Sequence, residues 1–170
     1  MPLPAAPATN TGSPFASMHG HHTGIRYPDF EAARSFWVDT LDWRVLQTWP
    51  YGELTLAYVS PPDQDDFHVE ILGGPGGTQQ PVYADVDESL VTHGLNHVCL
   101  SVDSVDDTIA ELRRRGVEVV NAPFEIEDIS ARLAFFRDPW GNLFELSEHT
   151  GDGDHAHRPT SLGAAEEAVS

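Results

Sequence analysis

The stretch that decides the fold is Phe136-Arg137-Asp138-Pro139-Trp140-Gly141-Asn142-Leu143-Phe144-Glu145-Leu146. Pro and Gly in the run Asp138–Gly141 are typical of a tight turn, because Pro presets one backbone angle and Gly adopts angles that other residues avoid. Apolar residues precede and follow this turn. We therefore predict a hairpin of two strands over 131–137 and 142–148, with Glu145 on the last strand.

Glu145 has a counterpart in the first half of the chain. Glu70 stands 75 residues before it, and the same offset relates His97 to His22. In each half the His falls on the first predicted strand and the Glu on the last, with a helix and two more strands between them. A repeated residue pair at one offset predicts that a strand-helix-strand-strand-strand module occurs twice.

Side chains alternate between the two faces of a strand, so the direction of these four residues is predictable. Val98, Leu100 and Val102 form the apolar face beside His97. If such faces pack on the helices, the two His and two Glu point to the opposite, concave side. A pseudo-twofold relation between the modules would then bring all four together.

Two imidazoles and two carboxylates suit a borderline divalent ion, and Zn, Ni, Co, Mn and Fe(II) all fit. The two carboxylates also balance the charge of one such ion, which matters because a buried carboxylate without a cation is costly. We therefore predict a metal site formed by His22, Glu70, His97 and Glu145.

Composition divides the chain and excludes some functions. The 170 residues carry 9 basic and 27 acidic side chains, a net charge of −18, which disfavours nucleic acid as a partner. The one cysteine, Cys99, excludes an internal disulfide and fits the cytoplasm, and no apolar run is long enough for a membrane span. We predict a flexible N-terminal tail, a single domain, and a flexible acidic C-terminal tail, over residues 1–17, 18–150 and 151–170. The domain divides into module one, a linker and module two, over residues 18–77, 78–94 and 95–150.

Three stretches resemble the vicinal oxygen chelate superfamily, which includes glyoxalases, bleomycin resistance proteins and extradiol dioxygenases. They are the run from His22 through Asp29 to the pair Phe36-Trp37, the run Asn96–Asp103, and the closing hairpin that ends at Leu146. This resemblance implies an α+β fold. In it two β-α-β-β-β modules form a cupped, eight-stranded mixed sheet around a metal.

The ligand set is closest to that of glyoxalase I-like proteins, which use all four positions. The resemblance implies a metal-dependent lyase or isomerase that acts on a small carbonyl compound through a metal-stabilised enediolate. It makes Glu145 the first choice for the base, with Glu70 as its catalytic partner. Arg26 resembles the Arg at the start of glyoxalase I that contacts substrate.

Two other functions stay open. Extradiol dioxygenases use Fe(II) held by residues that match His22, His97 and Glu145, but the carboxylate of Glu70 weighs against this reading. A non-enzymatic protein that binds a drug or metabolite is the other alternative, and the complete ligand set weighs against it. We expect a small-molecule substrate and a homodimer, and leave open whether the half-sites meet within one chain or across the dimer.

Overall fold

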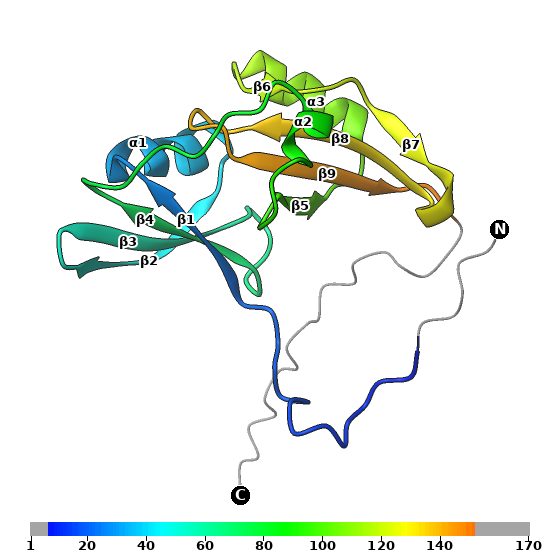
Figure 1. The fold of residues 1–170 in the computed structure, drawn as a ribbon, viewed down its shortest axis with the longest axis horizontal. Coiled ribbons are helices and arrows are strands. Elements are labelled where there is room, and N and C mark those ends of the chain that lie inside the picture. Colours follow the sequence, from blue (N-terminus) through cyan, green and yellow to red (C-terminus); the bar gives the residue numbers. More distant parts are fainter. Residues whose placement is uncertain (1–6, 152–170) are drawn as a thin grey trace, which may run out of the picture.

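A computed structural model describes residues 7–151 of the chain, so residues 1–6 and 152–170, which hold most of the predicted C-terminal tail, lie outside the described part. Figure 1 shows two β-sheets with helices between and beside them. The first sheet is built by the N-terminal module and the second by the C-terminal module. The predicted α+β fold with a repeated module is confirmed.

The first module runs from His22 to Gly73, and its strands lie side by side in the order β1-β4-β3-β2. Strand β1 pairs with β4 in parallel, and the other pairs are antiparallel, so the sheet is mixed. The elements are β1 (His22–Tyr27), α1 (Phe30–Ser35), a π-helical turn (Phe36–Thr40), β2 (Arg44–Tyr51), β3 (Leu54–Ser60) and β4 (His68–Gly73).

The second module repeats this plan, with strand order β5-β9-β8-β6, a parallel β5–β9 pair, and β7 added along β8. Its elements are β5 (His97–Ser101), α3 (Val105–Arg114), β6 (Glu118–Val119), β7 (Phe124–Ile126), a 3-10 turn (Glu127–Ile129), β8 (Ala131–Arg137) and β9 (Leu143–His149). Register confirms the repeat. Gly24 lies opposite Glu70 in module one, and Cys99 lies opposite Glu145 in module two.

One apolar core joins the modules. The Trp37 ring is 5.3 Å from the ring of Phe144 on β9, and the ring of Trp140 in the β8–β9 turn is 4.7 Å from that of Tyr27 on β1. Ile25, Val69 and Ile71 from the first sheet belong to the same buried cluster as Ala134, Phe136, Phe144 and Leu146 from the second. Each sheet therefore turns its apolar face to this core, and its other face is turned away from it.

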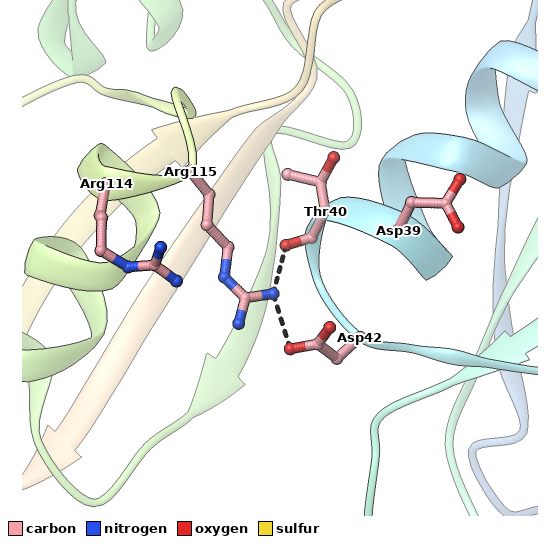
Figure 2. A pocket seen from close by; sticks show the side chains of 5 residues that line it. All are labelled: Asp39, Thr40, Asp42, Arg114 and Arg115. Atoms are coloured by element: carbon pink, nitrogen blue, oxygen red, sulfur yellow. Dashed lines mark hydrogen bonds and ion pairs between the residues drawn. The ribbon is translucent and has the colours of Figure 1, made fainter.

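An ionic contact at the surface reinforces the junction (Figure 2). Arg115, just after α3, donates to the carbonyl oxygen of Thr40 at 2.8 Å and pairs with the Asp42 carboxylate at 2.6 Å. Glu111 pairs with both Arg114 and Arg115. Both arginines pair with acidic neighbours and line a surface hollow together with Asp39, Thr40 and Asp42. This hollow lies at the junction between the two modules.

The linker between the modules follows the β8–β9 hairpin and contains α2 (Val86–Ser89). Gln79 donates to the carbonyl oxygen of Trp140 at 2.5 Å, and Arg137 donates to that of Ala84 at 3.3 Å. None of the helices within residues 7–151 is long and apolar enough to cross a membrane.

Three details differ from the sequence-based expectation. The one helix expected in module one ends as α-helix at Ser35 and continues with π winding from Phe36, where both Phe36 and Trp37 are buried in the core. Between β6 and β8, where the repeated plan has no further element, the chain forms β7 and a 3-10 turn. The eight predicted strands are hydrogen-bonded as two separate sheets, with β7 as a ninth strand.

Candidate metal centre

The structure contains two His–Glu pairs, which we call the first and second half-sites. The first consists of His22 on β1 and Glu70 on β4, where these strands pair in parallel. The His22 Nε2 atom is 3.5 Å from Oε2 of Glu70, and the side chains are 34% and 15% exposed. Both residues stand on the sheet face opposite Ile25, Val69 and Ile71, so they face away from the core. The sheet thus presents one imidazole nitrogen and one carboxylate together on its open face.

The second half-site repeats this arrangement on β5 and β9. His97 Nε2 is 3.2 Å from Oε2 of Glu145, with side chains 32% and 16% exposed. The pair lies opposite Phe144 and Leu146, which belong to the core. The offset of 75 residues in the sequence therefore corresponds to equal positions in the two sheets.

The repeat extends to the residues that orient each imidazole. The Nδ1 atom of His97 lies 2.9 Å from the amide oxygen of Asn96, and that of His22 lies 2.8 Å from Nδ1 of His21. Asn96 is itself held by hydrogen bonds to the hydroxyl and carbonyl oxygens of Ser89. A metal-binding His commonly hydrogen-bonds through one ring nitrogen and binds the ion through the other. In both halves Nε2 is the nitrogen that remains beside the carboxylate.

These donors fit a divalent ion chemically, but they are arranged as two pairs. Across residues 7–151 no group of three or more His, Cys, Asp or Glu side chains is placed to hold one ion within the chain. The structure therefore joins His22 to Glu70 and His97 to Glu145. It does not bring all four predicted ligands into one cluster in a single chain.

Aromatic side chains surround the first half-site. The Tyr58 ring is 5.1 Å from that of His22 and 4.7 Å from that of Trp49. Tyr58 lies directly opposite Glu70 in the β3–β4 register. Sequence reasoning missed both aromatic residues, because the cross-strand neighbours of Glu70 depend on a register that the sequence does not state.

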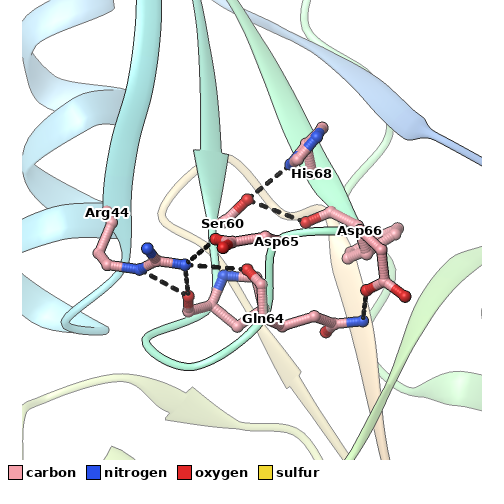
Figure 3. Close-up of polar contacts among 8 residues, drawn as sticks. Arg44, Ser60, Gln64, Asp65, Asp66 and His68 are labelled. Atoms are coloured by element: carbon pink, nitrogen blue, oxygen red, sulfur yellow. Dashed lines mark hydrogen bonds and ion pairs between the residues drawn. The ribbon is translucent and has the colours of Figure 1, made fainter. Parts of the chain in front are cut away.

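His68 lies on the same sheet face, but its side chain is hydrogen-bonded to Ser60 and not to the His22–Glu70 pair. Its Nδ1 lies 2.6 Å from the hydroxyl oxygen of Ser60, which also donates to the carbonyl oxygen of Phe67 at 3.0 Å (Figure 3). Burial and the neighbouring His21 lower the His68 pKa. Arg44 holds the adjoining loop by donating to the carbonyl oxygens of Pro61 and Gln64 and to the Asp65 carboxylate. Ser60 thus ties His68 to the end of the loop that joins β3 and β4.

The second half-site has an apolar wall and a thiol. The Phe135 ring is 5.3 Å from His97 and is stacked with Phe124. Cys99 donates from Sγ to Oε1 of Glu145 at 3.2 Å. The Cys99 side chain is exposed, but desolvation of its sulfur between the strands, with the hydrogen bond to Glu145, raises the pKa of the thiol to about 12. The thiol is therefore protonated near neutral pH.

Arg26, predicted to contact substrate, uses its guanidinium within the protein. Nη2 donates to the carbonyl oxygens of Gly74 and Pro75 at 2.9 and 2.6 Å, and Nη1 donates to those of Leu72 and Tyr27. These bonds fix the glycine-rich segment that follows β4. The predicted role in substrate binding remains a prediction, and in this arrangement it would require some of these bonds to be exchanged.

With this geometry in view, the class of the protein follows from comparison with known families. The family model described as the Glyoxalase/Bleomycin resistance protein/Dioxygenase superfamily matches residues 20–146. The chain belongs to this superfamily, as the three sequence motifs had implied.

Individual relatives are more distant. The chain is 29% identical over 120 residues to the uncharacterized protein YraH of Bacillus subtilis, covering 69% of this chain and 88% of that protein. It is 23% identical over 159 residues to the mitochondrial methylmalonyl-CoA epimerase of Homo sapiens, covering 86% and 88% of the two chains. Among solved structures, a glyoxalase family protein from Enterococcus faecalis superposes with a TM-score of 0.64 at 24% identity, covering 78% and 98%.

Proposed function

We propose that this protein is a metal-dependent lyase or isomerase that moves a proton beside a carbonyl group of a small molecule. The observation that carries the proposal is the repeated His–Glu pair. In each pair the His Nε2 faces the carboxylate, and Nδ1 is held by the preceding residue. Membership of a superfamily that contains such enzymes supports it.

The complete site, in this proposal, forms between two copies of the chain. Each copy contributes His22 with Glu70 to one site and His97 with Glu145 to the other. Both pairs lie on sheet faces turned away from the shared core, so a second copy can approach them. Twofold symmetry then yields two equal sites, because an isologous contact occurs twice.

A divalent ion held there would polarise neighbouring substrate oxygens and stabilise negative charge that develops next to them. The protein's own part is to carry the proton. A carboxylate close to the substrate accepts it from the carbon beside the carbonyl and can return it. The resemblance places Glu145 first as the base and Glu70 as its partner. The aromatic rings near His22 and the Phe135 wall near His97 would limit access of water.

The similarity to the mitochondrial methylmalonyl-CoA epimerase supports an isomerase within this class. An epimerase inverts one carbon centre, and removal and return of a proton at a carbon beside a carbonyl achieves this. Two carboxylates drawn from different modules suit that task, because one can remove the proton and the other can return it. Methylmalonyl-CoA is therefore the first substrate to test, and the hemithioacetal of methylglyoxal and glutathione is the second.

Metal content and proton exchange test the proposal together. Tag-free protein should bind about one equivalent of Ni, Co, Mn or Zn per chain, and His97→Ala should lose it. In D2O the loaded protein should exchange the proton beside the carbonyl, as followed by NMR. Glu145→Gln combined with Glu70→Gln should slow exchange by roughly 100- to 10,000-fold or more.

Other outcomes discriminate among the alternatives. Bound iron together with oxygen uptake in the presence of a catechol would replace the proposal with an extradiol dioxygenase. A protein that binds no divalent ion when one is added would have no metal centre, and a metabolite-binding role would then take its place.

A further inference from the structure

The two carboxylates of the candidate metal centre have different neighbours, although their strands are related by the repeat. Glu145 is held at both oxygens, because Oε2 lies 3.2 Å from His97 Nε2 and Oε1 accepts the Cys99 thiol at 3.2 Å. Cys99 is directly opposite Glu145 in the parallel β5–β9 register. The thiol and the carboxylate therefore share the open face of the second sheet.

Gly24 occupies the position that matches Cys99 in module one and is directly opposite Glu70. It has no side-chain donor to offer. Within residues 7–151 the one polar contact of the Glu70 carboxylate is with His22, at 3.5 Å. A Cβ atom at Gly24 would lie 3.4 Å from Oε2 of Glu70 and 3.2 Å from Cδ1 of Leu72. The glycine thus leaves space beside Glu70 where module two places a hydrogen-bond donor.

We propose that Cys99 is a positioning residue that fixes Glu145 as the stationary carboxylate, and that Glu70, beside Gly24, is the carboxylate that moves during proton transfer. This inference rests on the proposed function and reverses the order of roles that the resemblance implies. A carboxylate that leaves the ion to take up a proton and then returns has to change position. A thiol is a weak hydrogen-bond donor, but the Cys99 contact is one that Glu145 has and Glu70 lacks, so Glu145 is the more firmly held of the two carboxylates.

The hydrogen bond itself can be observed without substrate or metal. Cys99 is the only cysteine in the chain, so its S–H stretching band in the infrared is unambiguous. In the metal-free protein this band should lie below the frequency of a free thiol. Glu145→Ala removes the acceptor and should move the band to the free value, Glu70→Ala should leave it in place, and Cys99→Ala should remove it. A band that does not change in Glu145→Ala would overturn the positioning role.

Cobalt(II) alone supplies a second readout. Cys99→Ala should weaken cobalt binding by roughly 10-fold, as is typical when a group that orients a ligand is lost. It should also change the visible spectrum of the bound ion. Cys99→Ser retains a donor and should recover most of both properties. Equal cobalt affinity and spectra in the wild-type and Cys99→Ala proteins would contradict the proposal, as would a Cys99→Ser protein that behaves like Cys99→Ala.

A matched pair at the repeated position tests the mobile role of Glu70. Gly24→Ser adds a hydroxyl donor beside Glu70, and Gly24→Ala adds the same Cβ without the donor. Gly24→Ser should lower kcat for proton exchange several-fold more than Gly24→Ala, with similar KM for both. Equal kcat values would remove the assignment to Glu70. Absence of exchange in the wild-type protein would instead count against the proposed function, while the infrared result stands independently.

Discussion

At the scale of single residues, the side chains that orient the two imidazoles are as informative as the ligands. Asn96→Ala removes the amide oxygen that lies 2.9 Å from Nδ1 of His97. The ring is then free to turn, so we expect the affinity for cobalt(II) to fall roughly 10- to 100-fold, while the fold stays intact. Isothermal titration of metal-free protein measures this change. His93→Ala, an exposed linker position, is the matched control, and equal affinities for Asn96→Ala and His93→Ala would contradict the interpretation.

Gly73, the last residue of β4, is required by a close approach of the chain. A Cβ atom there would lie 2.4 Å from the Cα and 2.9 Å from the backbone nitrogen of Phe30, the first residue of α1. Backbone atoms cannot rotate out of the way, so α1 must shift from the sheet. We expect Gly73→Ala to lower the free energy of unfolding by about 1–3 kcal/mol, measured in urea. Gly20→Ala, with no atom within 4 Å, should change it little.

The sequence alone predicted some residues of the candidate site and missed others. It located His22, Glu70, His97 and Glu145, because their offset survives in the sequence and strand alternation fixes the face on which they stand. It missed Tyr58, whose place opposite Glu70 depends on the antiparallel register of β3 and β4. Register is set by packing across the sheet, and a single sequence does not record it.

At the scale of elements, the β8–β9 turn is organised by one buried carboxylate. Asp138 is 2% exposed, and its Oδ1 accepts from the backbone nitrogens of Trp140 and Asn142 at 3.0 and 2.9 Å. Its Oδ2 accepts from the Asn142 amide at 2.7 Å. Desolvation by burial outweighs these donors and raises the pKa of Asp138 above its ordinary value of 3.8.

A raised pKa in the folded state makes stability depend on pH in a definite direction. The folded protein binds the Asp138 proton more tightly than the unfolded chain does. Protonation of Asp138 therefore contributes fully to stability below pH 3.8, and this contribution is lost as the pH rises through the pKa of the folded state. The stability of the wild type relative to Asp138→Asn should therefore fall as pH rises across that window. Urea unfolding at a series of pH values measures it. Asp103→Asn, at an exposed position, is the control for removal of a surface carboxylate. A difference in stability between the wild type and Asp138→Asn that grows as pH rises would contradict the assignment.

The ends of helices and strands were predictable only where the pattern of apolar and polar residues in the sequence matches which side chains are buried. The hairpin around Asp138–Gly141 followed from its turn residues, and β8 and β9 lie where they were predicted. The π winding at Phe36 did not follow, because the segment packs Trp37 against Phe144 of the other module and the local sequence does not record that contact. Strand β7 is three residues long and has an exposed side chain at every position, so the alternation of Phe124, Glu125 and Ile126 is too short to distinguish a strand from a loop.

At the scale of the whole molecule, the sequence predicted two modules but not their placement. An offset of 75 residues states which positions are equivalent and is silent on how the modules face each other. That is decided by the core contacts of Trp37 and Trp140, which join the apolar sides of both sheets. The two His–Glu pairs therefore do not meet within residues 7–151 of one chain, which is the reason that the proposed four-donor site combines two chains.

Mixed dimers of two defective variants test this arrangement directly. Suppose that each site combines His22 and Glu70 of one chain with His97 and Glu145 of the other. A dimer of one His22→Ala chain and one His97→Ala chain then holds one doubly damaged site and one intact site. Co-expressed chains with different tags, isolated as heterodimers, should bind about half the metal of the wild type, although each variant alone binds little. Sites formed within a single chain would leave every site in the heterodimer damaged, and metal content no higher than that of the separate variants would therefore exclude the two-chain site.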